Sequence, residues 1–111
     1  MITIWHNPRC SKSRQTLALL DGRDAEVRKY LEDAPSVAEL RAAQAALGLP
    51  VIDMVRTKET LFKELGLSKG AAEDTLLEAM AANPKLIERP IVFANGQARL
   101  GRPPEQVLDI L

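Results

Sequence analysis

Cysteine and histidine are scarce in this sequence, since its 111 residues include one of each. A lone thiol cannot form an intramolecular disulfide, so the fold must be held by its core alone. A zinc site needs three or four protein ligands, which one cysteine and one histidine do not supply. We therefore expect no disulfide framework and no metal ion.

Excess charge and long apolar runs are also absent. Fifteen Lys and Arg balance fifteen Asp and Glu, whereas a nucleic-acid-binding surface needs an excess of cations. No stretch approaches the ~20 apolar residues that cross a bilayer, and the first residues do not resemble a signal peptide. We expect no nucleic-acid partner, no membrane association, a cytoplasmic location and a monomer.

The hydrophobic pattern predicts strands and helices in a definite order. Strands are expected at about 2–5, 26–31, 91–94 and 97–100, the last two joined by an Asn95-Gly96 turn. Helices are expected at about 10–20, 36–47, 58–65 and 73–82. A last helix opens at Pro103-Pro104, with Val107, Leu108 and Leu111 on its inner side. The stretch 50–55 fits either a strand or a helix.

This order, strand–helix–strand, helical block, then hairpin–helix, is that of an α/β thioredoxin-like fold with an inserted helical region. We predict a single domain over residues 1–111, with the helical insertion at about 35–84.

The lone cysteine stands where a strand passes into a helix. Cys10 would begin the helix at 10–20, where unpaired backbone N–H groups favour an anion such as a thiolate. Arg9, Lys12 and Arg14 add positive charge close by. Both effects lower a thiol pKa. His6, just after the first strand, would favour the thiolate if protonated or help to move a proton.

Three more arginines are candidate anion ligands: Arg56, Arg89 and Arg102. Guanidinium groups suit tetrahedral oxyanions, because their fork of donors meets two oxygens at once. In a thioredoxin-like fold, the loop before the third strand carries a cis proline that faces the active cysteine. We therefore predict a cis Arg89–Pro90 bond and place Arg89 near Cys10.

The spacing argues against a phosphatase-type loop. That loop needs an arginine six residues after the cysteine, and Thr16 stands there.

The motif His6-Asn7-Pro8-x-Cys10-x-x-Ser13-Arg14 resembles that of the ArsC family of arsenate reductases. Two further segments, Glu88-Arg89-Pro90-Ile91-Val92 and Gly101-Arg102-Pro103-Pro104-Glu105, extend the resemblance over nearly the whole chain. The basic loop and the end at Leu111 resemble a shorter, chromosomal type of member.

The resemblance implies a mechanism. The Cys10 thiolate attacks arsenate, glutathione attacks the arsenic–sulfur adduct, and glutaredoxin resolves the mixed disulfide as arsenite leaves. It implies that Arg56, Arg89 and Arg102 bind the oxyanion, that His6 activates the cysteine, and that no cofactor is bound. Arg14 is expected to help activate the cysteine through its charge. A single cysteine indeed needs an external thiol to complete a redox cycle.

Two alternatives stay open. The first is a glutathione-linked thiol oxidoreductase of the same fold with another substrate, which has no evident need for three oxyanion ligands. The second is a non-catalytic Spx-like regulator. Regulators of that type usually carry a Cys-x-x-Cys switch, and Cys10-Ser11-Lys12-Ser13 lacks the second thiol.

Overall fold

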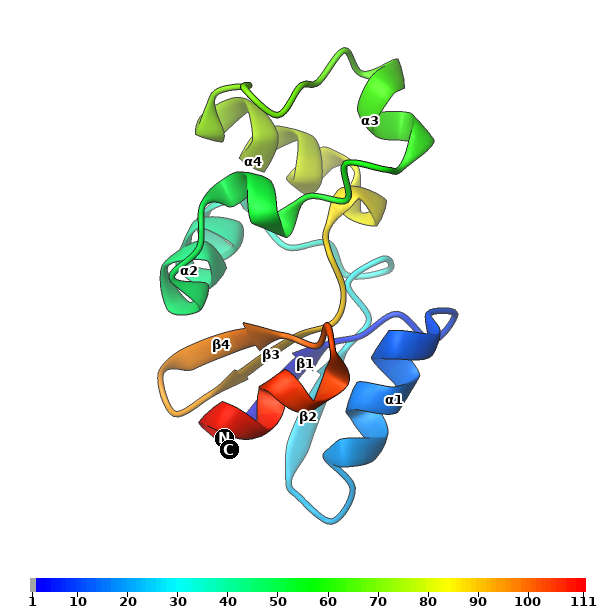
Figure 1. Ribbon diagram of the computed structural model, residues 1–111, viewed down its shortest axis with the longest axis vertical. Helices are drawn as coiled ribbons and strands as arrows, with labels where there is room; N and C mark the ends of the chain where they lie inside the picture. Colours follow the sequence, from blue (N-terminus) through cyan, green and yellow to red (C-terminus); the bar gives the residue numbers. More distant parts are fainter. Residues whose placement is uncertain (1) are drawn as a thin grey trace. The chain divides into compact units, whose positions relative to one another are not determined.

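The computed structural model describes residues 2–111 and contains short strands and helices in the order predicted (Figure 1). The strands are β1 (Ile2–Trp5), β2 (Ala25–Arg28), β3 (Ile91–Ala94) and β4 (Gln97–Leu100). The α-helices are α1 (Ser11–Leu19), α2 (Val37–Leu47), α3 (Thr60–Glu64) and α4 (Glu73–Ala82). The 3₁₀ helices are η1 (Val51–Met54), η2 (Pro84–Leu86) and η3 (Pro104–Ile110).

The chain groups into two compact units. The sheet unit contains the chain up to Asp33 together with Arg89–Leu111, and the helical unit is Ala34–Glu88. The predicted single domain over residues 1–111, with its insertion at about 35–84, stays a prediction.

The sheet unit is built on four strands in the order β2-β1-β3-β4. β1 pairs in parallel with β2, which it reaches through α1, and pairs antiparallel with β3. β3 and β4 form a hairpin. Its turn residues Asn95 and Gly96 have φ of 54° and 76°, as the predicted turn requires. This is a thioredoxin-like arrangement with a helical region inserted between β2 and β3, as predicted from the sequence.

One face of this sheet carries the core of the sheet unit. α1 and η3 lie side by side over that face (Figure 1). The buried residues that pack together there are Ile4, Leu20, Val92, Ala94, Val107 and Ile110. The first turns of α1 bury polar residues instead, because Ser13 and Thr16 are fully buried. This end of α1 is therefore built for something other than apolar packing.

The last helix differs from its prediction. η3 is a 3₁₀ helix, in which residues three apart share a face. Pro104, Val107 and Ile110 are accordingly buried, while Leu108 is 46% exposed. Placing Leu108 on the inner side was wrong, because that assignment assumed the α-helical period.

Other boundaries follow the sequence with small shifts. β2 ends at Arg28 rather than near residue 31, and the ambiguous stretch at 50–55 is largely η1. Ser36 and Glu39 form the capping box that opens α2, and Gly48 ends α2 with φ of 68°.

The helical unit is organised around α4, which packs against α2, η1 and η2. Two segments of this unit run antiparallel at an isolated bridge between Val55 and Ile87. The Arg56 N–H donates to the Leu86 carbonyl at 2.7 Å, and the Glu88 N–H donates to the Met54 carbonyl at 2.7 Å. Within residues 2–111, every helix is too short or too polar to cross a bilayer.

Among the glycines of the sheet unit, Gly101 has the most crowded surroundings. Its N–H donates to the Pro90 carbonyl at 2.9 Å. A Cβ at this position would lie 2.6 Å from Pro90 Cγ and closer still to Thr16 Oγ1. Only glycine fits between these two side chains without displacing them.

We therefore expect Gly101→Ala to lower the free energy of unfolding by roughly 1–3 kcal/mol, the usual cost of overpacking. Gly70→Ala is the matched control, because no atom lies within 4 Å of its added Cβ and its φ is not positive. Urea unfolding of both variants measures the difference. Equal stability of the two variants would show that the contact at Pro90 relaxes freely.

Candidate active site

Cys10 is the N-cap of α1 and lies at the end of the loop that leaves β1. Its N–H donates to the Asn7 carbonyl at 3.0 Å, and its carbonyl accepts the Arg14 N–H at 3.0 Å. The residue is 7% exposed, so its sulfur is largely withdrawn from water. The predicted placement of the cysteine at the start of a helix is confirmed.

Opposing influences set the pKa of the Cys10 thiol. Burial raises the pKa, because it disfavours the charged thiolate. The Ser13 N–H, the Arg89 side chain as donor and as charge, and the Lys12 N–H all lower it. Together these groups outweigh burial, and the pKa of Cys10 lies below its ordinary value. The sulfur is therefore prepared to act as a nucleophile at lower pH than a free thiol.

Ser13 ties the loop to the helix. Its hydroxyl oxygen lies 2.6 Å from His6 Nδ1 in a buried hydrogen bond and accepts the Asn7 N–H at 3.0 Å. Asn7 in turn accepts the Arg9 N–H on its side-chain oxygen at 3.0 Å. The loop that presents Cys10 is thus fixed by hydrogen bonds at both of its ends.

The electrostatics of His6 favour the neutral ring. Burial lowers the pKa of His6 first, and the positive charges of Lys29 and Arg14 lower it further. At neutral pH the imidazole is uncharged, because its pKa is below the ordinary value of about 6.5. Of the two roles considered for His6, the transfer of a proton fits this state and charge stabilisation by an imidazolium does not. A cysteine-activating role for His6 stays a prediction.

The Arg89–Pro90 bond is cis, as predicted, and the Arg102–Pro103 bond, for which no prediction was made, is cis as well. Arg89 acts directly on the Cys10 thiol, so its predicted nearness to the cysteine is confirmed. The Arg102 Nε donates to the Arg89 carbonyl at 2.8 Å. The sheet unit therefore brings two of the three candidate arginines together at the loop before β3.

The third candidate, Arg56, belongs to the helical unit. It is partly buried beside Glu59, with 3.1 Å between Arg56 Nη1 and Glu59 Oε2. Lys85 lies on the other oxygen of the same carboxylate at 3.7 Å. Arg56 thus sits in a small charged group of its own unit, and its role as an oxyanion ligand stays a prediction.

The cations next to Cys10 in the sequence have different surroundings. Arg14 Nη1 donates to the Pro8 carbonyl at 2.9 Å, and its charge acts on His6. Lys12 acts on the thiol through its backbone N–H. The side-chain charges on which the sequence argument relied are thus not the groups that lower the pKa of Cys10. Arg14 as a cysteine-activating residue stays a prediction.

Sequence reasoning did not single out Ser13 and Asn7 as site residues. Both were visible as members of the motif around Cys10, but a serine and an asparagine in a turn carry no chemical signal of their own. Their importance comes from partners six or seven residues away. Among residues 2–111, no cluster of three or more His, Cys, Asp or Glu side chains is placed to hold a metal ion.

The model of the ArsC family matches residues 5–110. An arsenate reductase of Neisseria meningitidis serogroup A is 50% identical over 99% of this chain and 97% of its own length. The uncharacterized protein YfgD of Escherichia coli is 53% identical over 99% of this chain and 96% of its own length.

A comparison with solved structures shows the same similarity. An arsenate reductase from Vibrio cholerae superimposes with a TM-score of 0.96 and is 59% identical. The match covers 99% of this chain and 97% of that one.

The geometry of Cys10 makes a prediction about its reactivity. The rate of alkylation by iodoacetamide should rise with pH at a midpoint below about 8.5, the ordinary thiol value. Arg89→Gln should move that midpoint upward, because it removes a donor and a positive charge from the sulfur. Arg99→Gln, on β4, is the control and should leave the midpoint unchanged.

A midpoint at or above the ordinary value in the unmodified protein would contradict the proposed balance of burial and donors. Equal midpoints in the Arg89 and Arg99 variants would show that Arg89 does not set the thiol pKa.

Proposed function

The chain belongs to the ArsC family, and on that premise we propose that it is an arsenate reductase that uses Cys10 as its nucleophile and glutathione with glutaredoxin as its reductant. The observation that carries the proposal is a thiol with a lowered pKa, placed at a helix start against an arginine. Relatives that are 50% identical or more over nearly full length, named as arsenate reductases, support the choice of substrate.

The reaction begins with the Cys10 thiolate attacking arsenic. An As–S bond forms, one arsenate oxygen leaves as water after protonation, and arsenic stays pentavalent. In this proposal His6 supplies the proton transfer, which its neutral ring, hydrogen-bonded to the Ser13 hydroxyl, supports. Arg89, with Arg102 beside it, would meet the oxyanion and offset its repulsion of the thiolate.

The second thiol completes the reduction. Glutathione attacks the Cys10 sulfur, an S–S bond forms, and the As–S bond breaks with its electron pair going to arsenic. Arsenic becomes trivalent and leaves as arsenite. Glutaredoxin then attacks the glutathione sulfur of the mixed disulfide and releases the Cys10 thiolate. The chain needs no bound cofactor in this scheme, and the glutathione pool of the cytoplasm would supply the electrons.

An alternative is a thiol oxidoreductase of the same fold that acts on another glutathione-linked substrate. The chain is also similar to YfgD, an uncharacterized protein, and we therefore consider this alternative function as well. The pairing of Arg89 with Arg102 favours the reductase, because a neutral disulfide presents no oxyanion to bind.

The direct test is an arsenate-dependent oxidation of NADPH with glutathione, glutaredoxin and glutathione reductase. We expect turnover with the unmodified protein and none with Cys10→Ser, since the only thiol of the chain is lost. Cys10→Ser should keep its fold, which circular dichroism checks. No arsenate-dependent turnover, or full turnover in Cys10→Ser, would overturn the proposal.

Substitution of the three candidate arginines distinguishes the arsenate reductase from the alternative thiol oxidoreductase. A dianion and a thiolate about 4 Å apart repel by roughly 4 kcal/mol per pair of unit charges at an effective dielectric of 20. Replacing Arg56, Arg89 or Arg102 by Lys or Gln should lower arsenate turnover about 100-fold or more where the arginine stabilises the oxyanion. The reaction of Cys10 with a neutral disulfide should change much less in the Arg56 and Arg102 variants.

For Arg89 the disulfide rate must be compared at equal thiolate fraction, because this arginine also sets the pKa of the thiol. Arg99→Gln is again the control. Equal losses on arsenate and on disulfide would mean damage to the thiolate or the fold. Unchanged arsenate turnover in all three arginine variants would favour the alternative.

A further inference from the structure

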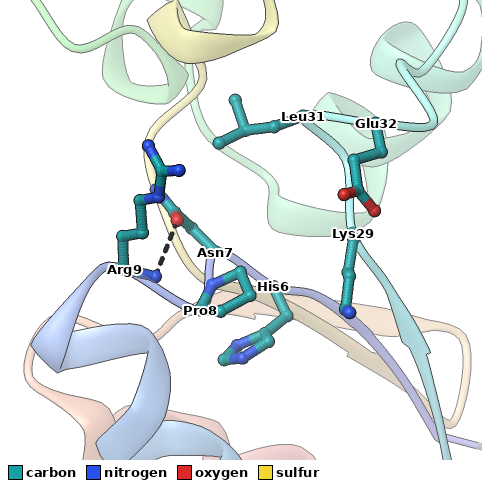
Figure 2. A pocket seen from close by; sticks show the side chains of 7 residues that line it. All are labelled: His6, Asn7, Pro8, Arg9, Lys29, Leu31 and Glu32. Carbon is teal, nitrogen blue, oxygen red and sulfur yellow. Dashed lines mark hydrogen bonds between the residues drawn. The ribbon is translucent and has the colours of Figure 1, made fainter.

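A pocket of about 280 Å³ lies beside the cysteine loop, and the reaction scheme assigns it no role (Figure 2). Its walls are the loop at residues 6–9, which follows β1, and residues 29–32, which follow β2. These two strands are parallel neighbours, so their carboxyl ends meet at the same edge of the sheet. Pockets at that edge commonly hold ligands in α/β proteins.

The pocket is lined by three charged side chains: Arg9, Lys29 and Glu32. Arg9 and Lys29 approach from the two opposite walls, and Glu32 lies on the same wall as Lys29 (Figure 2). All three are exposed, and within residues 2–111 none of them forms a salt bridge with another side chain. Their charges are therefore available to a ligand.

The apolar part of the lining comes from Pro8 and Leu31. Leu31 is 42% exposed although it is a large hydrophobic side chain. A ligand that fits this lining carries two anionic groups, one cationic group and methylene groups between them. A γ-glutamyl peptide thiol has this composition, with two carboxylates, one ammonium group and an aliphatic chain.

The position of the pocket matches what the second half of the reaction needs. Arg9 directly precedes Cys10, and consecutive Cα atoms are about 3.8 Å apart. A tripeptide of about 10 Å extended length that is bound in the pocket would lie against the residue that directly precedes Cys10. Arg89, which acts on the sulfur from the loop before β3, is not among the residues that line this pocket.

We propose that the pocket between the 6–9 loop and residues 29–32 binds the peptide thiol that reduces the Cys10 adduct, with Arg9 and Lys29 on its carboxylates and Glu32 on its ammonium group. The assignment rests on the proposed function, in which that thiol attacks the Cys10 sulfur and the As–S electron pair goes to arsenic.

Binding is tested without arsenate, so that this experiment and the turnover assay can fail separately. S-methylglutathione, which cannot react, is titrated into ¹⁵N-labelled full-length Cys10→Ser. We expect saturable shifts of the amides lining the pocket, at residues 6–9 and 29–32. Lys29→Glu in the same background should weaken binding about tenfold or more, the scale of one charged hydrogen bond.

Arg23→Glu is the matched control, because it makes the same change of charge at an exposed position outside the pocket. Glu32→Gln should weaken binding of S-methylglutathione but not of its N-acetyl derivative, which has no ammonium group. Shifts centred elsewhere, no saturable binding, or equal effects of Lys29→Glu and Arg23→Glu would each overturn the assignment.

Turnover supplies the second measurement. In the arsenate assay, Lys29→Glu should raise the KM for glutathione about tenfold or more and leave the KM for arsenate unchanged. Lys29 also lowers the pKa of His6, so arsenite release with 2-mercaptoethanol, a thiol without charged groups, measures the part of the loss in Lys29→Glu that comes through His6. The loss with glutathione should exceed that loss about tenfold or more, and equal losses with the two thiols would overturn the assignment. An equal rise in both KM values would contradict a thiol site, whereas absent arsenate turnover together with specific binding would refute the proposed function alone.

Discussion

The site depends on keeping a nearly buried sulfur negatively charged. Burial of Cys10 works against the thiolate, and an apolar pocket around the same sulfur would leave an inert thiol. Three groups reverse the outcome: the Ser13 and Lys12 N–H groups of α1 and the side chain of Arg89. The first two are local, since they come with the first turn of the helix. The third depends on the sheet, because Arg89 is 79 residues away along the chain and reaches the sulfur only when β3 pairs with β1.

The need to keep the sulfur charged also explains why the first turns of α1 bury polar side chains. Ser13 and Thr16 occupy positions where a helix packed on a sheet would otherwise bury apolar side chains. Ser13 uses its position to hold His6 and the Asn7 N–H, and Thr16 returns a hydrogen bond to the Lys12 carbonyl at 2.8 Å. Hydrophobic packing comes from the C-terminal part of α1, where Leu17 and Leu20 belong to the same apolar cluster as Val107 and Ile110 of η3. The N-terminal end of α1 therefore positions the thiol, and its C-terminal end packs in the hydrophobic core.

Charge is distributed unevenly around the cysteine although the chain as a whole is neutral. Arg89 and Arg102 lie together at the loop before β3, and Arg9 and Lys29 line the pocket beside the 6–9 loop. In the proposed reaction these two cationic places receive different anions, the oxyanion at the first and the carboxylates of the reducing thiol at the second. Burial and the positive charges of Lys29 and Arg14 lower the pKa of His6 and so favour its neutral form.

The sequence alone determined the local features. The helix start at Cys10, the capping box at Ser36, the Asn95-Gly96 turn and the order of strands and helices all depend on neighbouring residues, so they could be predicted from spacing and residue type. The tertiary structure decided what depends on distant partners or on competing backbone forms. η3 adopts the 3₁₀ period, which leaves Leu108 exposed. The Ser13 hydroxyl forms hydrogen bonds with both His6 and Asn7, because the chain folds back at this point. Arg89, rather than the nearby Arg9 and Arg14, supplies the side chain that acts on the thiol. A side-chain charge acts through its distance and direction in space, and nearness along the chain sets neither.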